Sequence, residues 1–459
     1  MTKYDGKNVL IIGAARQGLA LARFLVKQGA HVTLNDRLNP EQLEFEMKQL
    51  SGTNVRWVLG EHPVNLLDGI DFLCVSGGVP LTLPLIVTAA QKGIPITNDS
   101  QIFMEEVKAP VVGITGSAGK TTTTTIIGRI AAQHFSAPRK IWVGGNIGNP
   151  LIEYLADITE TDLVILELSS FQLELMSISP HLSAVLNITP NHLDRHADMQ
   201  AYIDAKSRIL AYQKHGDIAV LNRDDPEAWK LRSMVRGRLV SFGKDKTAAS
   251  EPQVFVQNGA IWAEENGNLH KLVETASIKL RGAHNLLNVL AACSIAWSLN
   301  FTPSSIKAGI EGFNGVDHRL QLVRELNGVR WYNDSIATAP ERTIAALLSF
   351  DEPLILLLGG RDKNLPWEPL AKIVHKRVEH VILFGEAVEK IAAAIEQPKA
   401  GECLQSVTRV NTLQEALEQA DRLAIPGDTV LLSPGGTSYD AFKDFAERGE
   451  AFINWVNSL

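Results

Sequence analysis

The sequence of 459 residues has few cysteines, no excess of basic residues and no long apolar run. Its three cysteines, Cys74, Cys293 and Cys403, lie far apart, so they predict neither a disulfide framework nor a cysteine metal site. Lys and Arg number 44 against 51 Asp and Glu, a formal net charge of −7, which argues against nucleic acid as the main ligand. Because no apolar stretch approaches ~18 residues and no signal-peptide pattern opens the chain, we expect a cytoplasmic protein without membrane insertion.

Strand-like and helix-like segments alternate along the whole chain, which is typical of parallel sheets covered by helices. Hydrophobic residues make up 45% of the sequence and charged residues 21%, as in ordinary globular proteins. The alternation falls into three successive blocks. We therefore predict an α/β fold with three doubly wound domains. These are a Rossmann-like domain over residues 1–108, a central P-loop-type domain over 109–314 and a second Rossmann-like domain over 315–459.

The first block opens with a strand, a glycine turn and a helix, which together predict a βαβ unit. The turn reads GAARQG over residues 13–18, a dinucleotide-binding fingerprint in which Ala15 replaces the middle glycine. That glycine normally lets the backbone approach a pyrophosphate, so its replacement argues against a dinucleotide cofactor. A nicotinamide-dependent oxidoreductase or regulator is one alternative function, and a measurement of NAD(P) binding would test it.

The second block opens with GITGSAGKTTTTT over residues 113–125, between an apolar strand and a helix. Gly116 and Gly119 admit a phosphate close to the backbone, Lys120 supplies a positive charge, and the Thr121 hydroxyl can reach Mg²⁺. Ile114, however, stands where the usual P-loop has its first glycine. The loop predicts a nucleotide site. A P-loop ATPase with a mechanical or regulatory role is a second alternative.

Polar side chains follow the later strands of this block, at the ends where open α/β sheets bind ligands. Glu167 follows the apolar run 163–166, and His192 and Asp194 follow the run 184–188. We predict that Glu167 is a magnesium ligand or a general base. His192 and Asp194 predict a polar cluster near the same edge of the sheet.

Ten motifs in order resemble the Mur ligase family: GSAGKTT, GGNIG, LELSSFQLE, NHLDRH, AKSRI, GAHNLLN, DHRLQ, NDSIAT, GGRDK and LLSPGGTSYDAF. The resemblance covers essentially the whole chain. It is closest to the members that join D-glutamate to UDP-N-acetylmuramoyl-L-alanine. The phosphate loop of the family has the shorter form Gly-x-x-Gly-Lys-Ser/Thr, so Gly116 is the relevant first glycine.

The resemblance implies an ATP-dependent amide ligation in cytoplasmic peptidoglycan precursor synthesis, and hence a role in cell-wall biogenesis, cell shape and cell division. ATP phosphorylates the alanyl carboxylate, the glutamate amine attacks the acyl phosphate, and ADP and phosphate are the products. Phosphoryl transfer depends on positioning and charge neutralisation, which the loop and two magnesium ions would supply. We expect the protein to be a monomer.

The resemblance also assigns roles to individual positions. Lys120, Glu167, His192 and Lys206 are the expected catalytic residues. Thr121, Glu167, His192 and Lys206 are the expected metal ligands, with Lys206 carbamylated so that its cation becomes an oxygen donor. The expected ATP site comprises Gly116, Ser117, Ala118, Gly119, Lys120, Thr121, Thr122, Asn285, Asn288, Arg319 and Asp334. The expected substrate contacts are Ala15, Arg16, Asp36, Ser76 and Gly77 for the uridine diphosphate, Asn146 and Ser169 near the metals, and Thr338, Lys363, Ser438 and Phe445 for the amino acid.

The sequence departs from the family pattern at the expected glutamate site. Ile336 stands where the D-glutamate ligases usually carry a lysine, and Ala339 stands where asparagine is common. An isoleucine cannot pair with a carboxylate. Either another cation compensates, with Arg361 and Lys443 as candidates, or the substrate sits differently. A Mur ligase relative that adds L-glutamate or another amino acid is therefore an alternative.

Overall fold

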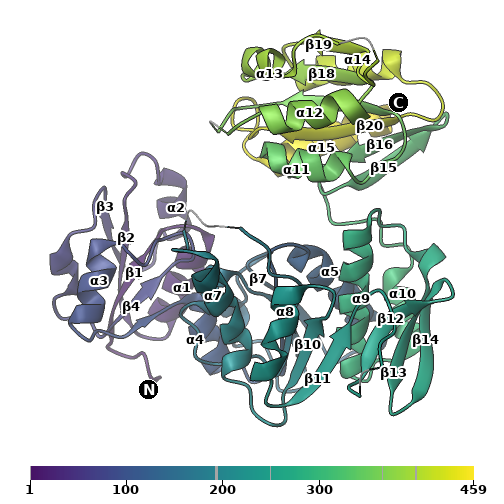
Figure 1. Ribbon diagram of the computed structural model, residues 1–459. Coiled ribbons are helices and arrows are strands. Elements are labelled where there is room, and N and C mark those ends of the chain that lie inside the picture. The colour runs from purple at the N-terminus through teal and green to yellow at the C-terminus, as the bar shows by residue number, and fades with distance from the viewer. Residues whose placement is uncertain (1, 192–194, 249, 364, 399–400) are drawn as a thin grey trace. The chain divides into compact units, whose positions relative to one another are not determined.

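The computed structural model describes residues 2–191, 195–248, 250–363, 365–398 and 401–459, and its strands form three β-sheets (Figure 1). The chain divides into two compact units. The first unit consists of Met1–Ile278 and His284–Glu311, and the second of Lys279–Ala283 and Gly312–Leu459. The predicted α/β fold class is confirmed. Within the described residues, no helix is both long enough and apolar enough to cross a membrane.

The first sheet lies at the start of the chain and has five parallel strands in the order β3-β2-β1-β4-β5. Its strands are short and apolar, and the helix after β1 packs one apolar face against them, burying Leu19, Ala22 and Leu25. The elements are β1 (Asn8–Ile12), α1 (Arg16–Lys27), β2 (His31–Asp36), α2 (Glu44–Gln49), β3 (Val55–Leu59), β4 (Phe72–Val75), α3 (Pro84–Gln91), β5 (Ile96–Thr97) and α4 (Asp99–Glu106).

The second sheet has nine strands in the order β14-β13-β12-β11-β10-β9-β6-β8-β7. The strands from β6 to β12 pair in parallel, and β13 and β14 add an antiparallel edge. The strands are β6 (Val111–Thr115), β7 (Ile141–Gly145), β8 (Leu163–Glu167), β9 (Leu182–Val185), β10 (Ile218–Asn222), β11 (Arg238–Phe242), β12 (Gln253–Gln257), β13 (Ala260–Glu265) and β14 (Asn268–Glu274). The helices of this part include α5 (Lys120–His134), α6 (Ser170–Leu173), α7 (Met199–Ala211), α8 (Pro226–Lys230), α9 (Ala283–Ser298) and α10 (Pro303–Ile310).

The third sheet belongs to the second unit and has six strands in the order β15-β16-β20-β17-β18-β19. β15 and β16 are antiparallel, and the other pairs are parallel. The elements are β15 (Gln321–Leu326), β16 (Val329–Asn333), α11 (Pro340–Leu347), β17 (Leu354–Gly359), α12 (Glu368–Arg377), β18 (His380–Phe384), α13 (Val388–Ile395), β19 (Ser406–Arg409), α14 (Leu413–Leu423), β20 (Thr429–Gly435) and α15 (Phe445–Ser458).

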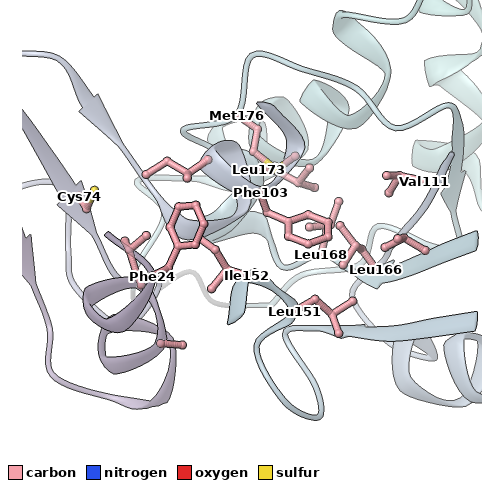
Figure 2. Close-up of a cluster of buried hydrophobic side chains, with 14 of the residues drawn as sticks. Phe24, Cys74, Phe103, Val111, Leu151, Ile152, Leu166, Leu168, Leu173 and Met176 are labelled. Carbon is pink, nitrogen blue, oxygen red and sulfur yellow. The ribbon is translucent and has the colours of Figure 1, made fainter. Parts of the chain in front are cut away.

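One apolar cluster runs through both sheets of the first unit (Figure 2). Phe24 of α1 and Phe103 of α4 come from the first block, and Leu151, Ile152 and Leu173 come from the second. All five side chains are at least nine-tenths buried. Burial of such side chains stabilises by about 1.5–3 kcal/mol each, so the two blocks form one packed body. The start of α1 lies close to the end of β7, since Gln17 Nε2 donates to the Gly145 carbonyl at 3.2 Å.

Candidate active site

The phosphate loop connects the end of β6 to the start of α5. Gly119 is the N-cap of α5 and has a φ of +81°, a conformation that favours glycine. A Cβ atom on Gly119 would lie 2.1 Å from the Oδ1 atom of Asn288, so a larger residue would require the Asn288 side chain to move. Helix α5 has no side-chain cap, and its first turn therefore presents backbone N–H groups at a positively polarised end. This is the geometry of an anion site.

Asn187, which sequence reasoning did not single out, fixes the shape of this loop. The Ala118 N–H donates to Asn187 Oδ1 at 2.8 Å, and Asn187 Nδ2 donates to the Ala118 carbonyl at 3.1 Å. The Ser117 N–H donates to the Asn187 carbonyl at 3.0 Å, and the Ser117 hydroxyl donates to the Thr189 carbonyl at 2.9 Å. The loop is thus tied to the segment after β9. The sequence signal for this role was an asparagine two residues after the buried strand β9.

Two lysines reach the same carbonyl oxygen in the loop. Lys120 Nζ donates to the Gly116 carbonyl at 2.8 Å, and Lys206 Nζ of α7 donates to it at 3.0 Å. Lys206 is only 1% exposed. Burial and the positive charge of Lys120 lower the pKa of Lys206 well below its usual value, and Glu167 opposes this only in part. The neutral amine of Lys206 is therefore favoured far more than in water.

Oxygen donors meet beside the two lysines. The Thr121 hydroxyl donates to Glu167 Oε2 at 2.8 Å, and Asn146 Nδ2 donates to Glu167 Oε1 at 2.8 Å. Glu167 ends β8 and is 2% exposed. A hydroxyl and a carboxylate at hydrogen-bond distance form a donor set that suits a hard cation such as Mg²⁺. Among the described residues, no group of three or more His, Cys, Asp or Glu side chains is arranged to hold a metal ion.

The remaining predicted residues of the central block differ in where the structure places them. His192 and Asp194 lie outside the described residues. Ser169 lies two residues after Glu167 and forms a capping box with Gln172 at the start of α6, so its hydroxyl is engaged in the fold. Asn288 Nδ2 donates to Asn285 Oδ1 at 3.1 Å, and both asparagines lie on α9. Asn288 also lies against Gly119, and Thr122 is buried in the first turn of α5.

The predicted uridine diphosphate residues gather at the carboxyl ends of β1, β2 and β4. The Ala14 N–H donates to Asp36 Oδ2 at 2.8 Å, and the Ser76 hydroxyl donates to the Gly13 carbonyl at 3.0 Å. Ala15 is the N-cap of α1, and Gly77 follows Ser76. Arg16 Nη2 donates to the Asn146 carbonyl at 3.3 Å. Arg16 therefore connects this group with the cluster around Glu167.

The third group lies in the second unit. Asp334 is buried, and its carboxylate accepts from the Leu320 N–H at 3.1 Å and from the Ser433 hydroxyl at 2.8 Å. Burial raises the pKa of Asp334 to about 7, and the nearby charges of Arg319 and Arg342 oppose the rise. Lys363 Nζ lies 3.4 Å from the Thr338 hydroxyl, to which it donates.

Arg448 of α15, which sequence reasoning missed, joins the segments that carry this third group. Its Nε donates to the Ser335 hydroxyl at 3.0 Å, its Nη2 to the Ser335 carbonyl at 2.9 Å, and its Nη1 to the Gly436 carbonyl at 3.2 Å. Burial lowers the pKa of Arg448 to about 10, so it remains a cation at neutral pH. Ser335 precedes Thr338, Gly436 precedes the buried Ser438, and Phe445 begins the same helix. One buried guanidinium therefore fixes all three segments.

Three families of Mur ligase domains match successive parts of the chain. The MurD-like N-terminal domain of Mur ligases matches residues 7–98, the Mur ligase middle domain residues 114–296, and the Mur ligase glutamate ligase domain residues 318–436.

Curated relatives match the chain over nearly its full length. The UDP-N-acetylmuramoylalanine–D-glutamate ligase of Symbiobacterium thermophilum is 39% identical over 449 residues, which are 98% of this chain and 97% of that protein. The enzyme of the same name from Pelotomaculum thermopropionicum is 40% identical over 457 residues, covering 99% of this chain and 98% of that protein.

Solved structures share the fold at lower identity. The UDP-N-acetylmuramate–alanine ligase MurC of Thermotoga maritima superposes with a TM-score of 0.59 at 19% identity, covering 98% of this chain and 99% of that one. The MurF ligase of Thermotoga maritima in complex with ADP superposes with a TM-score of 0.55 at 18% identity, covering 99% of this chain and 95% of that one.

Proposed function

This chain belongs to the Mur ligase family, and we propose that it uses ATP to join D-glutamate to UDP-N-acetylmuramoyl-L-alanine. Family membership, predicted from ten motifs, is confirmed. The proposal depends above all on one arrangement, the loop in which Lys120 and Lys206 share the Gly116 carbonyl beside the Thr121–Glu167 pair. That arrangement combines positive charge, an anion site and oxygen donors. The chain that carries it is 40% identical to the UDP-N-acetylmuramoylalanine–D-glutamate ligase of Pelotomaculum thermopropionicum.

The reaction would begin at the phosphate loop. The N–H groups at the start of α5 and the Lys120 ammonium would hold the triphosphate and stabilise the charge that develops on it. The alanyl carboxylate would attack the terminal phosphorus, the bond to ADP would break, and an acyl phosphate would form. The amine of glutamate would then attack the carbonyl carbon and lose a proton. Phosphate would leave from the tetrahedral intermediate.

Thr121 and Glu167 would hold a magnesium ion, which their oxygen atoms fit. Bound Mg²⁺ neutralises phosphate charge during transfer. We propose that His192 takes part at a second metal and that Asn146, through its bond to Glu167, fixes the orientation of the carboxylate. Ser169 would place the substrate and the metals from its position at the start of α6.

We propose that Lys206 is carbamylated in the active enzyme. The neutral amine is the form that reacts with CO₂, and the lowered pKa of Lys206 favours that form. The nitrogen would form a bond to the carbon of CO₂ and release a proton. The product is an anion with two oxygen donors. It would replace the repulsion between Lys120 and Lys206 with attraction.

The three blocks would divide the substrates among them. Residues 1–108 would bind the uridine diphosphate through Ala15, Arg16, Asp36, Ser76 and Gly77. Residues 109–314 would bind ATP through the loop, Asn285 and Asn288. Residues 315–459 would bind the amino acid through Thr338, Lys363, Ser438 and Phe445, and would add Arg319 and Asp334 to the nucleotide. We propose that the protein acts as a monomer in the cytoplasm.

A ligation assay tests the proposal. The purified protein is mixed with UDP-N-acetylmuramoyl-L-alanine, ATP and Mg²⁺, and with D-glutamate, L-glutamate or meso-diaminopimelate in parallel. We expect one ADP and one phosphate for each amide product, with D-glutamate preferred and the product identified by mass. Preference for another amino acid would favour the alternative that Ile336 motivates. ATP hydrolysis without an acceptor, or full ligation by Lys120→Ala, would contradict the proposal.

A further inference from the structure

Arg342 lies beside the position where the predicted glutamate site departs from the family pattern. It lies in the first turn of α11, and its Nη1 donates to the Ile336 carbonyl at 3.2 Å. The guanidinium is exposed, so the rest of its N–H groups remain accessible from solvent. The side chain of Ile336 supplies no charge here. Arg342 places its positive charge beside the backbone carbonyl of Ile336.

Lys363 brings a second positive charge close to Arg342. Burial and the charge of Arg342 lower the pKa of Lys363, so the two cations lie within electrostatic range of each other. Lys363 also donates to the Thr338 hydroxyl at 3.4 Å. Two cations within electrostatic range repel each other, and a bound carboxylate would relieve that repulsion.

Neither Arg342 nor Lys363 forms an ion pair with any residue in the described parts of the chain. The charge of Arg342 opposes the burial-raised pKa of Asp334, but the two oxygens of that buried carboxylate already accept from Leu320 and Ser433. Other arginines of the unit have carboxylate partners: Arg281 and Arg330 both pair with Glu352, and Arg361 pairs with Glu386 at 2.8 Å. Arg361, one of the two cations considered from the sequence, therefore already has a carboxylate partner.

We propose that Arg342, together with Lys363 and Thr338, binds a carboxylate of the amino acid that the enzyme adds. Arg342 takes the place of the cation that residue 336 lacks. Its planar guanidinium can donate two parallel hydrogen bonds to a carboxylate, which gives orientation as well as charge. The inference rests on the proposed ligase function and specifies which residue selects the acidic substrate.

The test compares steady-state kinetics of Arg342→Met with those of the native protein, varying each of the three substrates in turn. We expect the KM for D-glutamate to rise about 10- to 100-fold, as for the loss of a charged hydrogen bond, with the KM values for ATP and for the UDP-sugar acid unchanged. Arg342→Lys keeps the charge and should lose less. Arg377→Met, which changes a partly exposed arginine of α12, is the control and should keep native kinetics.

A second variant tests charge placement directly. In the Arg342→Met background, Ile336→Lys should lower the KM for D-glutamate again, because it returns a cation to the same corner of the site. An unchanged KM for D-glutamate in Arg342→Met would overturn the proposal. The proposal would also be overturned if Arg361→Met or Lys443→Met, and not Arg342→Met, selectively raised the KM for D-glutamate. The native protein is assayed in parallel. If it ligates D-glutamate, a negative result for Arg342→Met counts against the role of Arg342 and not against the ligase function.

Discussion

At the residue scale, the chemistry of the phosphate loop depends on two amines that donate to one carbonyl oxygen. Lys120 and Lys206 both donate to Gly116, and Lys206 is buried while it does so. Two like charges so close and away from water destabilise each other. The arrangement is compatible with an anionic substrate on Lys120 and a neutral or carbamylated Lys206. It is poorly suited to two permanent cations.

Replacement of Lys206 by alanine tests the carbamate. We expect Lys206→Ala to lower ligation at least about 100-fold, because an oxygen donor beside the phosphate loop is lost. Acetate or propionate should restore part of the activity by filling the space with a carboxylate. Lys214→Ala, at an exposed lysine beyond α7, serves as the control and should retain activity. Absence of any rescue across a range of short carboxylic acids would refute the carbamate role.

Asp99 is a half-buried residue whose carboxylate oxygen Oδ1 is shielded from solvent. It begins α4, and its Oδ1 atom has no hydrogen-bond partner among the described residues. Burial raises the pKa of Asp99 from 3.8 to about 6, and backbone hydrogen bonds offset this only in part. A carboxyl whose pKa is raised on folding binds its proton more tightly in the folded state. The free energy of unfolding therefore falls as pH rises from about 4 to about 6.

Asp99→Asn should remove this pH dependence. The raised pKa corresponds to about 3 kcal/mol of destabilisation above pH 6, since each pKa unit is worth about 1.4 kcal/mol. We expect the variant to be more stable than the native protein at pH 7.5 and nearly equal to it at pH 4. Denaturant unfolding at both pH values measures the difference. An equal change in stability at the two pH values would show that ionisation of Asp99 is not the cause.

The sequence predicted the position of residues that follow from local pattern. Gly119 and Lys120 belong to the start of a helix that follows a strand, and Glu167 belongs to the end of a parallel strand, so both were expected at the same edge of the sheet. Asn187 and Arg448 were missed because each acts on segments far away in the chain. Which carbonyls a buried guanidinium reaches is decided by packing, and no single-sequence pattern encodes it.

At the element scale, close packing of α10 against α5 supports the helix that follows the phosphate loop. Gly309 of α10 lies against Ile130 of α5, and a Cβ on Gly309 would lie 2.5 Å from the Ile130 Cα. Arg129 Nε donates to the Gly309 carbonyl at 3.1 Å, which holds the two helices in register. Because α5 begins with Lys120, this contact fixes the helix that presents the lysine.

Gly309→Ala should force α5 and α10 apart. The added methyl group meets backbone atoms that cannot rotate away, and overpacking of this kind costs about 1–3 kcal/mol. We expect a lower melting temperature and a higher KM for ATP. Lys307→Ala, on the exposed face of α10, is the matched control and should change stability by less than about 0.5 kcal/mol. Native stability of Gly309→Ala would mean that the two helices can separate at little cost.

The antiparallel edge of the second sheet was missed although the sequence contains its signals. The turns β12–β13 and β13–β14 carry Asn258-Gly259 and Asn266-Gly267, and all four residues have positive φ. Asn-Gly pairs between alternating segments are a strong hairpin signal, since both turn residues need positive φ. The parallel strands that precede them in the same block favoured the prediction of an all-parallel sheet. The parallel strands themselves were predictable because they are short, apolar and followed by polar turns.

The chain divides into two compact units at the scale of the whole molecule, and segments near residues 278–284 and 311–312 connect them. The first two blocks share an apolar core, whereas the third has its own cores around β16 to β20. Bodies with separate cores unfold separately unless a large interface or a shared ligand couples them. The sequence predicted three blocks, and it could not indicate that two of them share one core.

Calorimetry should therefore resolve two unfolding transitions in the protein without ligands, and Gly309→Ala should lower only the one that belongs to the first unit. A non-hydrolysable ATP analogue with Mg²⁺ should raise that transition, by about 2.7 kcal/mol of stability at a hundredfold excess over its Kd. Lys120→Ala should abolish the shift.

If Arg319 and Asp334 hold the same nucleotide, the second transition should also rise, and Arg319→Ala should cancel that rise alone. A single ligand-free transition would contradict independent units, and an undiminished shift in Lys120→Ala would contradict binding at the phosphate loop.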